Sequence, residues 1–181
     1  MLDKTIDAAL LKIHTHFLNQ LMNIVTNIGN KITIVILTIA IVLFLIYKKE
    51  YVKNKMFVLA MALGGIGMEI LKYLIKKPRP ITMTIPETGY GFPSGHATIS
   101  MILFGMLIVM FKDKIKNKTN RIIFISINVF LILAVGFSRL YFNVHYPTDV
   151  LGGYTLGLIA IFFSEYLTKK LKFMKKKKLF W

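Results

Sequence analysis

The stretch GFSRLYFNVHYPTDVLGG, residues 136–153, lies between two strongly apolar runs of the chain. Three of its side chains can carry a charge near neutral pH, namely Arg139, His145 and Asp149. Ionisable side chains are costly inside a lipid bilayer, and where they occur they mark ion pairs or functional sites. If the flanking runs cross a membrane, these three side chains lie at its surface, between the end of one span and the beginning of the next.

The composition is that of a membrane protein. Of the 181 residues, 55% are hydrophobic and the formal net charge is +16. The mean hydropathy is +0.61, which is more than a soluble domain needs to form one core. The basic excess does not indicate nucleic-acid binding, because the lysines cluster between apolar runs and do not line one polar face. The chain contains no cysteine, which excludes disulfides and thiolate metal sites.

A helix needs about 20 residues to cross the hydrocarbon core. Five apolar runs are candidates, at residues 24–47, 56–74, 97–111, 122–137 and 149–167. The third and fourth are short and must borrow flanking residues, such as 94–96 or Ser138. The chain shows no internal repeat and no linker, so residues 1–181 are expected to form a single domain. The expected fold is an all-α integral membrane helical bundle with about five transmembrane helices.

Lysine-rich segments between these runs predict an orientation. Residues 48–55, 112–121 and 169–178 hold 16 of the 24 lysines and arginines. All three fall on the same side if each run crosses once, and the positive-inside rule assigns that side to the cytoplasm. The C-terminus is then cytoplasmic, and the loops 75–96 and 138–148 face outward together from the plasma membrane.

The two ends of the chain carry their own predictions. Residues 1–23 have apolar positions at helical spacing with charges between them, which favours an amphipathic helix lying in the outer interface over a sixth span. His14 and His16 are interpreted as surface residues of this helix. The transmembrane bundle then covers residues 24–167. Residues 168–181 form a basic cytoplasmic tail, either a polybasic membrane anchor or a solvated segment.

Two further polar clusters lie on the side predicted to face outward. KYLIKKPRP, residues 72–80, begins and nearly ends with cations, and its prolines stop the preceding helix. FPSGHATIS, residues 92–100, begins the third apolar run. Ser94 is placed as a helix N-cap, and Gly95 lets the backbone approach a ligand. Unpaired N–H groups at this helix N-terminus favour an anion.

The arginines indicate the kind of anion. The chain has only three, Arg79, Arg121 and Arg139, and two of them lie in the outward clusters. A guanidinium binds phosphate bidentately, which an ammonium group cannot do. A sequence that otherwise uses lysine for positive charge therefore indicates oxyanion recognition at Arg79 and Arg139.

The histidines and their neighbours indicate chemistry. Asp149 follows His145 by four residues, and a helical turn beginning at Pro147 brings the carboxylate to the imidazole. The carboxylate would fix the tautomer and leave the other ring nitrogen as a nucleophile. Asp149 is also suited to cap the fifth helix, and the two roles are compatible. His96 belongs to the second cluster and lies on the same side.

Metal catalysis is disfavoured by the shortage of carboxylates. A two-metal phosphatase needs several, and the outward segments offer only Glu87 and Asp149, with Glu69 inside the second apolar run. Glu69 precedes Lys72 by three residues and is interpreted as its ion-pair partner. We therefore expect no metal, no cofactor, no nucleic acid and no obligate protein partner.

The clusters together resemble the three-part signature of the type-2 phosphatidic acid phosphatase superfamily. The resemblance covers residues 72–149 and rests on Lys72, six residues, then Arg79-Pro80; Pro93-Ser94-Gly95-His96; and Ser138-Arg139, five residues, His145, three residues, Asp149. It implies a metal-independent phosphatase with a helical-bundle fold.

The resemblance also implies roles by motif position. His145 would be the nucleophile that forms a phosphohistidine intermediate, Asp149 would orient it, and His96 would be the general acid that protonates the leaving group. The phosphoryl oxygens would be held by Lys72, Arg79, Ser94, the Gly95 N–H and Arg139, with support from Pro80, Pro93, Ser138 and Glu69.

The expected substrate is a lipid phosphate or pyrophosphate at the outer face. Undecaprenyl pyrophosphate, phosphatidylglycerophosphate and phosphatidic acid all remain open, with roles in phospholipid metabolism or in recycling the cell-wall lipid carrier. Lys76 and Lys77 could hold a second phosphate or anchor the helix at the interface. Two alternatives stand beside the phosphatase, namely a non-catalytic protein that binds or flips lipid phosphates and a vanadate-dependent peroxidase.

Overall fold

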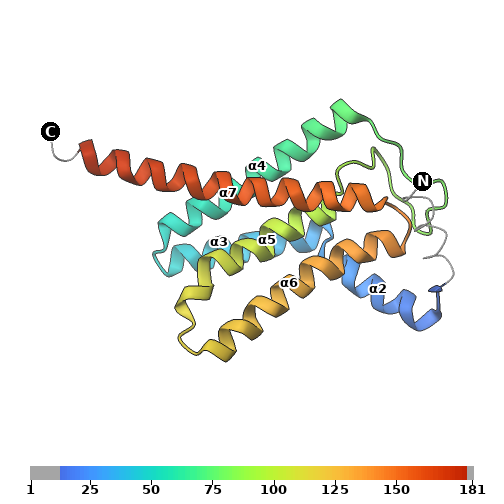
Figure 1. Ribbon diagram of the computed structural model, residues 1–181, viewed down its shortest axis with the longest axis horizontal. Helices are drawn as coiled ribbons and strands as arrows, with labels where there is room; N and C mark the ends of the chain where they lie inside the picture. The colour runs from blue at the N-terminus through green and yellow to red at the C-terminus, as the bar shows by residue number, and fades with distance from the viewer. Residues whose placement is uncertain (1–12, 179–181) are drawn as a thin grey trace.

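The computed structural model describes residues 13–178, and within that range it contains helices and no strand (Figure 1). The elements in chain order are α2 (His16–Ile28), α3 (Lys31–Tyr47), α4 (Tyr51–Ile75), α5 (Gly95–Phe111), the short 3-10 helix η2 (Lys112–Lys114), α6 (Lys118–Tyr141) and α7 (Pro147–Lys178). The prediction of an all-α bundle is confirmed.

Four of these helices, α4 to α7, are long and apolar enough to cross a membrane, and α2 with α3 meets the same test only as a pair bent by 45°. The expectation of about five spans is confirmed if the bent pair counts as one. The two short apolar runs extend into their flanks as expected, because α5 begins at Gly95 and α6 continues to Tyr141. The protein is a multi-pass membrane protein.

The first predicted span, residues 24–47, is not continuous, and the boundary placed at residue 23 was wrong. Helix α2 runs across that boundary and ends at Ile28, and α3 starts two residues after Gly29. The break has a local cause, since the side chain of Asn30 accepts the N–H of Ile32 at 3.2 Å and starts a new helix. Residues 1–12 of the expected interfacial helix lie outside the described residues.

The connections between the helices divide between the two ends of the bundle (Figure 1). The basic segments 48–55 and 112–121 share one end, where Lys114 donates a hydrogen bond to Glu50. The long loop between α4 and α5 and the turn between α6 and α7 share the other end, where the N–H of Thr84 donates to the carbonyl of Phe142 at 3.1 Å. This is the alternation that the lysine pattern predicted.

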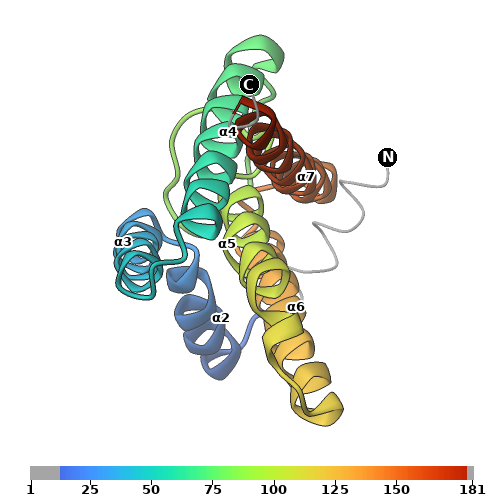
Figure 2. The same ribbon diagram turned by 90° about the vertical axis from the view of Figure 1, so that its left-hand side faces the viewer.

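Helix α5 forms the centre of the bundle. Eight of its residues are buried, and it packs against α4, α6 and α7. Helix α3 lies at the outside, beside α4 (Figure 2), and many of its large apolar side chains are exposed, as a lipid-facing helix requires. Helix α7 continues past residue 167 as a helix to Lys178, and residues 179–181 of the expected tail lie outside the described residues.

Glycine permits the close packing of α7 against α5. A Cβ atom on Gly153 would lie 2.7 Å from the carbonyl oxygen of Ser94, and one on Gly157 would lie 2.7 Å from the Cβ atom of Met101. Small residues four positions apart are a common means of bringing two membrane helices into backbone contact. The contact fixes the start of α7, which carries Asp149, against the start of α5.

We predict that Gly153→Ala lowers the stability of the protein in detergent by about 1–3 kcal/mol, because the added methyl group meets a backbone carbonyl that cannot rotate away. The thermal unfolding midpoint measures this. Gly65→Ala is the matched control, since a Cβ there meets no described atom within 4 Å and alanine favours the helix. Equal midpoints for Gly153→Ala and the wild type would contradict the packing argument.

Candidate active site

A cavity of about 390 Å³ lies where the ends of α3, α4 and α5 meet. Six of the site residues predicted from the sequence line it, namely Glu69, Lys72, Arg79, Gly95, His96 and His145. The rest of the wall includes apolar side chains of three helices, from Ile34 and Val35 on α3, Met68 on α4 and Ile99 on α5. The cavity therefore joins a polar, cationic region to an apolar one.

The other predicted residues lie behind this lining. Ser94 and Asp149 are fully buried, and Arg139 is 2% exposed. Pro80, Pro93 and Ser138 are buried as well, and the hydroxyl of Ser138 donates to the carbonyl of Val135 at 2.6 Å. Glu69 pairs with Lys72, as predicted, with 4.0 Å between Oε1 and Nζ.

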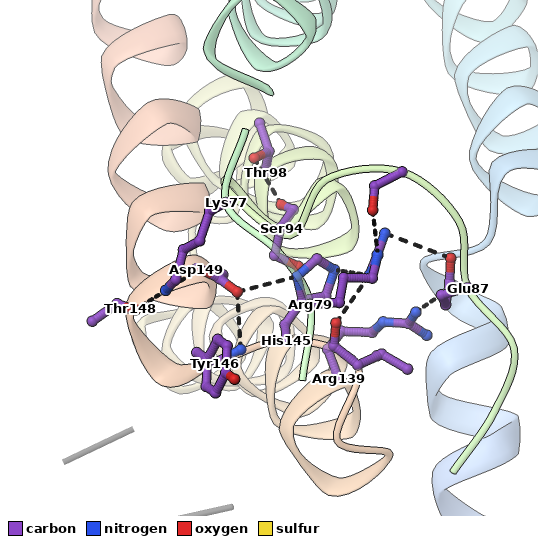
Figure 3. Close-up of polar contacts among 12 residues, drawn as sticks. Lys77, Arg79, Glu87, Ser94, Thr98, Arg139, His145, Tyr146, Thr148 and Asp149 are labelled. Atoms are coloured by element: carbon purple, nitrogen blue, oxygen red, sulfur yellow. Dashed lines mark hydrogen bonds and ion pairs between the residues drawn. The ribbon is translucent and has the colours of Figure 1, made fainter. Parts of the chain in front are cut away.

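His145 lies between a cation and an anion (Figure 3). Its Nε2 is 3.1 Å from Nη1 of Arg79, and its Nδ1 is 3.6 Å from Oδ2 of Asp149. A guanidinium can only donate, so Nε2 accepts and the ring proton is assigned to Nδ1, on the side of Asp149. This is the tautomer that the spacing of His145 and Asp149 predicted.

The surroundings of His145 keep its ring neutral. Burial lowers the pKa of His145 below its ordinary value, and the charges of Arg79 and Arg139 lower it further, while Asp149 raises it. Burial is the largest of these effects. A neutral imidazole with an unprotonated Nε2 is the form that can attack an electrophile.

Asp149 has two further partners. Its Oδ2 accepts the N–H of Tyr146 at 2.9 Å, so the carboxylate caps the start of α7 while it faces His145. Its Oδ1 accepts from Nζ of Lys77 at 2.7 Å, and Lys77 also donates to Thr148 at 2.7 Å. Neither role considered for Lys77, a second phosphate or an interfacial anchor, included this contact of its ammonium group with Asp149.

The arginine pair, Arg79 and Arg139, converges on one carboxylate. Arg139 donates to Oε1 of Glu87, and Nη2 of Arg79 lies 3.8 Å from Oε2 of the same side chain (Figure 3). Arg139 also donates to the hydroxyl of Thr26 at 2.6 Å. Neither contact of Arg139 was predicted from the sequence, because Glu87 and Thr26 both lie far from it along the chain.

Ser94 occupies the N-cap position of α5, as predicted, but its hydroxyl does not cap the helix. Within the described part of the chain, six buried side-chain atoms have no hydrogen-bond partner. Buried polar atoms of this kind are rare, and three of the six belong to predicted site residues, namely Oγ of Ser94, Nε of Arg139 and Nδ1 of His145.

The sequence matches the family described as the PAP2 superfamily over residues 55–173, which include all three motifs. The chain belongs to the PAP2 superfamily. It is a membrane phosphatase by family, and the resemblance drawn from the motifs is confirmed.

Individual PAP2 relatives cover most of the chain. Phosphatidylglycerophosphatase B from Bacillus subtilis is 26% identical over 178 residues, 97% of this chain and 87% of that protein. The crystal structure of a transmembrane PAP2 type phosphatidylglycerolphosphate phosphatase from Bacillus subtilis superimposes with a TM-score of 0.80 at 25% identity, covering 93% of this chain and 85% of that one. An undecaprenyl-diphosphatase from Sulfolobus acidocaldarius is 30% identical over 115 residues, 60% of this chain and 50% of that protein.

His96, which lines the cavity together with His145, is positioned by the break between α2 and α3. A Cβ atom on Gly29 would lie 2.8 Å from Cδ2 of His96 and 2.7 Å from Cγ1 of Val135. The glycine that ends α2 therefore makes room for the imidazole at the start of α5.

The interpretation of His14 as a surface residue was wrong. Its ring stacks on Tyr141 with the centroids 4.2 Å apart, and its Nε2 lies 2.9 Å from the carbonyl oxygen of the same residue. The contact ties the chain before α2 to the end of α6. His16 is exposed, as expected.

We predict that Gly29→Ala lowers kcat for a phosphate ester about ten- to a hundredfold, because the methyl group displaces the ring of His96 from its position. Steady-state kinetics of the purified protein measure this, with Gly65→Ala as the control, since a Cβ there meets no described atom within 4 Å. A kcat equal to that of the wild type would show that His96 does not depend on Gly29.

Proposed function

We propose that the protein is a metal-independent integral membrane phosphatase that hydrolyses a lipid phosphate or lipid diphosphate through a phosphohistidine intermediate. The observation that carries the proposal is the cavity itself. His96 and His145 line it together with Lys72 and Arg79, and its other wall is apolar. A phosphorylated headgroup fits the cationic part, and a hydrocarbon chain fits the apolar part.

The geometry supports a two-step mechanism. Nε2 of His145 attacks the phosphorus atom, an N–P bond forms, and the bond to the leaving oxygen breaks as His96 supplies its proton. Asp149 stabilises the positive charge that develops on the ring of His145. Water then attacks the phosphorus and passes a proton to His96, the N–P bond breaks, and phosphate is released.

The cations around the cavity contribute through charge. Lys72, Arg79 and Arg139, with Ser94 and the N–H of Gly95, bind the oxygens of the phosphoryl group. Charge on these oxygens is what a phosphatase must position and stabilise in the transition state.

The substrate class follows from the apolar wall and from the relatives. Phosphatidylglycerophosphate, undecaprenyl pyrophosphate and phosphatidic acid combine a phosphate with long hydrocarbon chains. Phosphatidylglycerophosphatase B, whose match covers 97% of this chain, supports the first of them. A panel of these three lipids compared by kcat/KM identifies the preferred substrate.

We assign the site to the outer face of the plasma membrane, with the C-terminus in the cytoplasm. The support is the distribution of positive charge, because 16 of the 24 lysines and arginines lie in three segments that alternate with the site loops. The partners are the lipid substrate and the surrounding membrane lipids. One domain holds the whole site.

The test is release of phosphate from a lipid phosphate by the detergent-purified protein in excess chelator. We expect turnover by the wild type, none by His145→Ala, and a covalent phosphoryl label on the wild type that is stable to base and labile to acid. Unimpaired turnover by His145→Ala would refute the mechanism. Lipid binding without turnover would favour the binding or flipping protein, and halide oxidation with added vanadate would favour the peroxidase.

The pH dependence offers a second test. The pKa of His145 lies below its ordinary value because the ring is buried, so the acid limb of kcat/KM is expected below pH 6.5. Asp149 raises that pKa, so Asp149→Asn should shift the limb to still lower pH and reduce kcat about a hundredfold. Comparing the variant with the wild type on one substrate cancels the titration of the substrate. A shift to higher pH would contradict the assignment.

A further inference from the structure

The carboxylate of Glu87 pairs with the guanidinium groups of Arg79 and Arg139, which the proposed reaction uses to bind phosphate. Glu87 divides its two oxygens between the arginine pair, Oε1 toward Arg139 and Oε2 toward Arg79 (Figure 3). Arg79 is also the residue whose Nη1 lies 3.1 Å from Nε2 of His145. The carboxylate therefore lies beside the atom proposed to attack the phosphorus.

Contacts other than those with the Glu87 side chain hold both arginines in position. Arg79 donates to the carbonyl oxygens of Thr88 and Gly89, each at 3.1 Å, and of Val144 at 2.9 Å. Arg139 is 2% exposed and donates to the hydroxyl of Thr26 at 2.6 Å. These contacts hold both guanidinium groups in place whether or not Glu87 is present.

Glu87 is the movable member of this cluster. Its side chain is 28% exposed, compared with 8% for Arg79 and 2% for Arg139, and it lines the cavity. It belongs to the long loop between α4 and α5, outside the helices. A carboxylate and a phosphate use the same kind of guanidinium donor, so a phosphoryl group can take the donors that Glu87 uses only when Glu87 leaves them.

We propose that Glu87 is a built-in competitor for phosphate, and that it sets the affinity of the arginine pair for every phosphate ligand. The inference rests on the proposed function, because it takes the arginine pair as the phosphoryl site. Glu87 neutralises two buried cations when no phosphate is bound, and unpaired buried charges are costly. It weakens the binding of any phosphate by the same factor.

This uniform penalty has different consequences for substrate and product. A lipid phosphate is concentrated in the membrane and gains binding free energy from the apolar wall formed by Ile34, Val35 and Ile99. Inorganic phosphate has no such contact. Glu87 thus keeps free phosphate out of the site and speeds the departure of the product, while the membrane-bound substrate still binds.

The test compares Glu87→Gln and Glu87→Ala with the wild type. We expect the inhibition constants of inorganic phosphate and orthovanadate to fall about tenfold in both variants, the factor that corresponds to one charge-assisted hydrogen bond. The KM for a lipid phosphate should fall by the same factor, because the competitor acts on all ligands alike. Glu165→Gln is the control, since Glu165 pairs with Lys169 near the other end of α7 and should leave all three constants unchanged.

The direction in which the phosphate affinity changes in the Glu87 variants distinguishes a competitor from a structural ion pair. If Glu87 only held the arginines in place, its removal would weaken phosphate binding or leave it unchanged, and either result in a folded variant overturns the proposal. Should Glu87→Gln and Glu87→Ala fail to fold, Glu87→Asp keeps the charge on a shorter side chain. We then expect an inhibition constant for phosphate below that of the wild type, and an equal or higher value overturns the proposal.

A second measurement distinguishes a failure of the proposed function from a failure of the proposed role of Glu87. It is the binding of inorganic phosphate to the same purified proteins, followed by titration calorimetry. Calorimetry needs no turnover, so a wild type that hydrolyses no lipid phosphate would refute the function while the comparison of affinities still decides the role of Glu87. Normal turnover with equal phosphate affinities would leave the phosphatase intact and refute the competitor.

Discussion

The rest of the site depends on one interaction, the pairing of two buried guanidinium groups with the carboxylate of Glu87 at one end of a membrane bundle. Arg139 lies at the end of α6, where it meets Thr26 of α2 and Glu87 of the long loop. Arg79 is held by backbone carbonyls of that loop and of the turn before α7. A buried cation without partners is unstable, so these contacts bind the loop, the turn and two helices, α2 and α6, into one structure.

Close backbone packing brings the histidines and their supports to that structure. The approach of α7 at Gly153 to the carbonyl of Ser94 sets the start of α7 against the start of α5, and the break at Gly29 makes room for His96. Larger residues at these two glycines would separate helices that carry different members of the site. The catalytic arrangement thus rests on positions that have no reactive side chain.

Much of the fold could be predicted because the signals are local. Apolar length indicated the helices, lysine-rich segments indicated which connections share an end, and the spacing of His145 and Asp149 indicated a shared helical turn. The failures concern partners distant in the chain. Lys77 was considered as a phosphate ligand or as an interfacial anchor, yet it pairs with Asp149, 72 residues away, and His14 was assigned to the surface, yet it stacks on Tyr141.

The sequence by itself determined the membrane helices, the end of the bundle that holds the polar clusters, and the residue types from which a phosphoryl site is proposed. Hydropathy and short-range spacing are properties of neighbouring residues, so they are visible without coordinates. Only the tertiary structure decided how the charges are paired, because Glu87 reaches Arg139 from 52 residues away. Which anion faces a buried cation depends on the packing of loops against helix ends, and no local pattern records that packing.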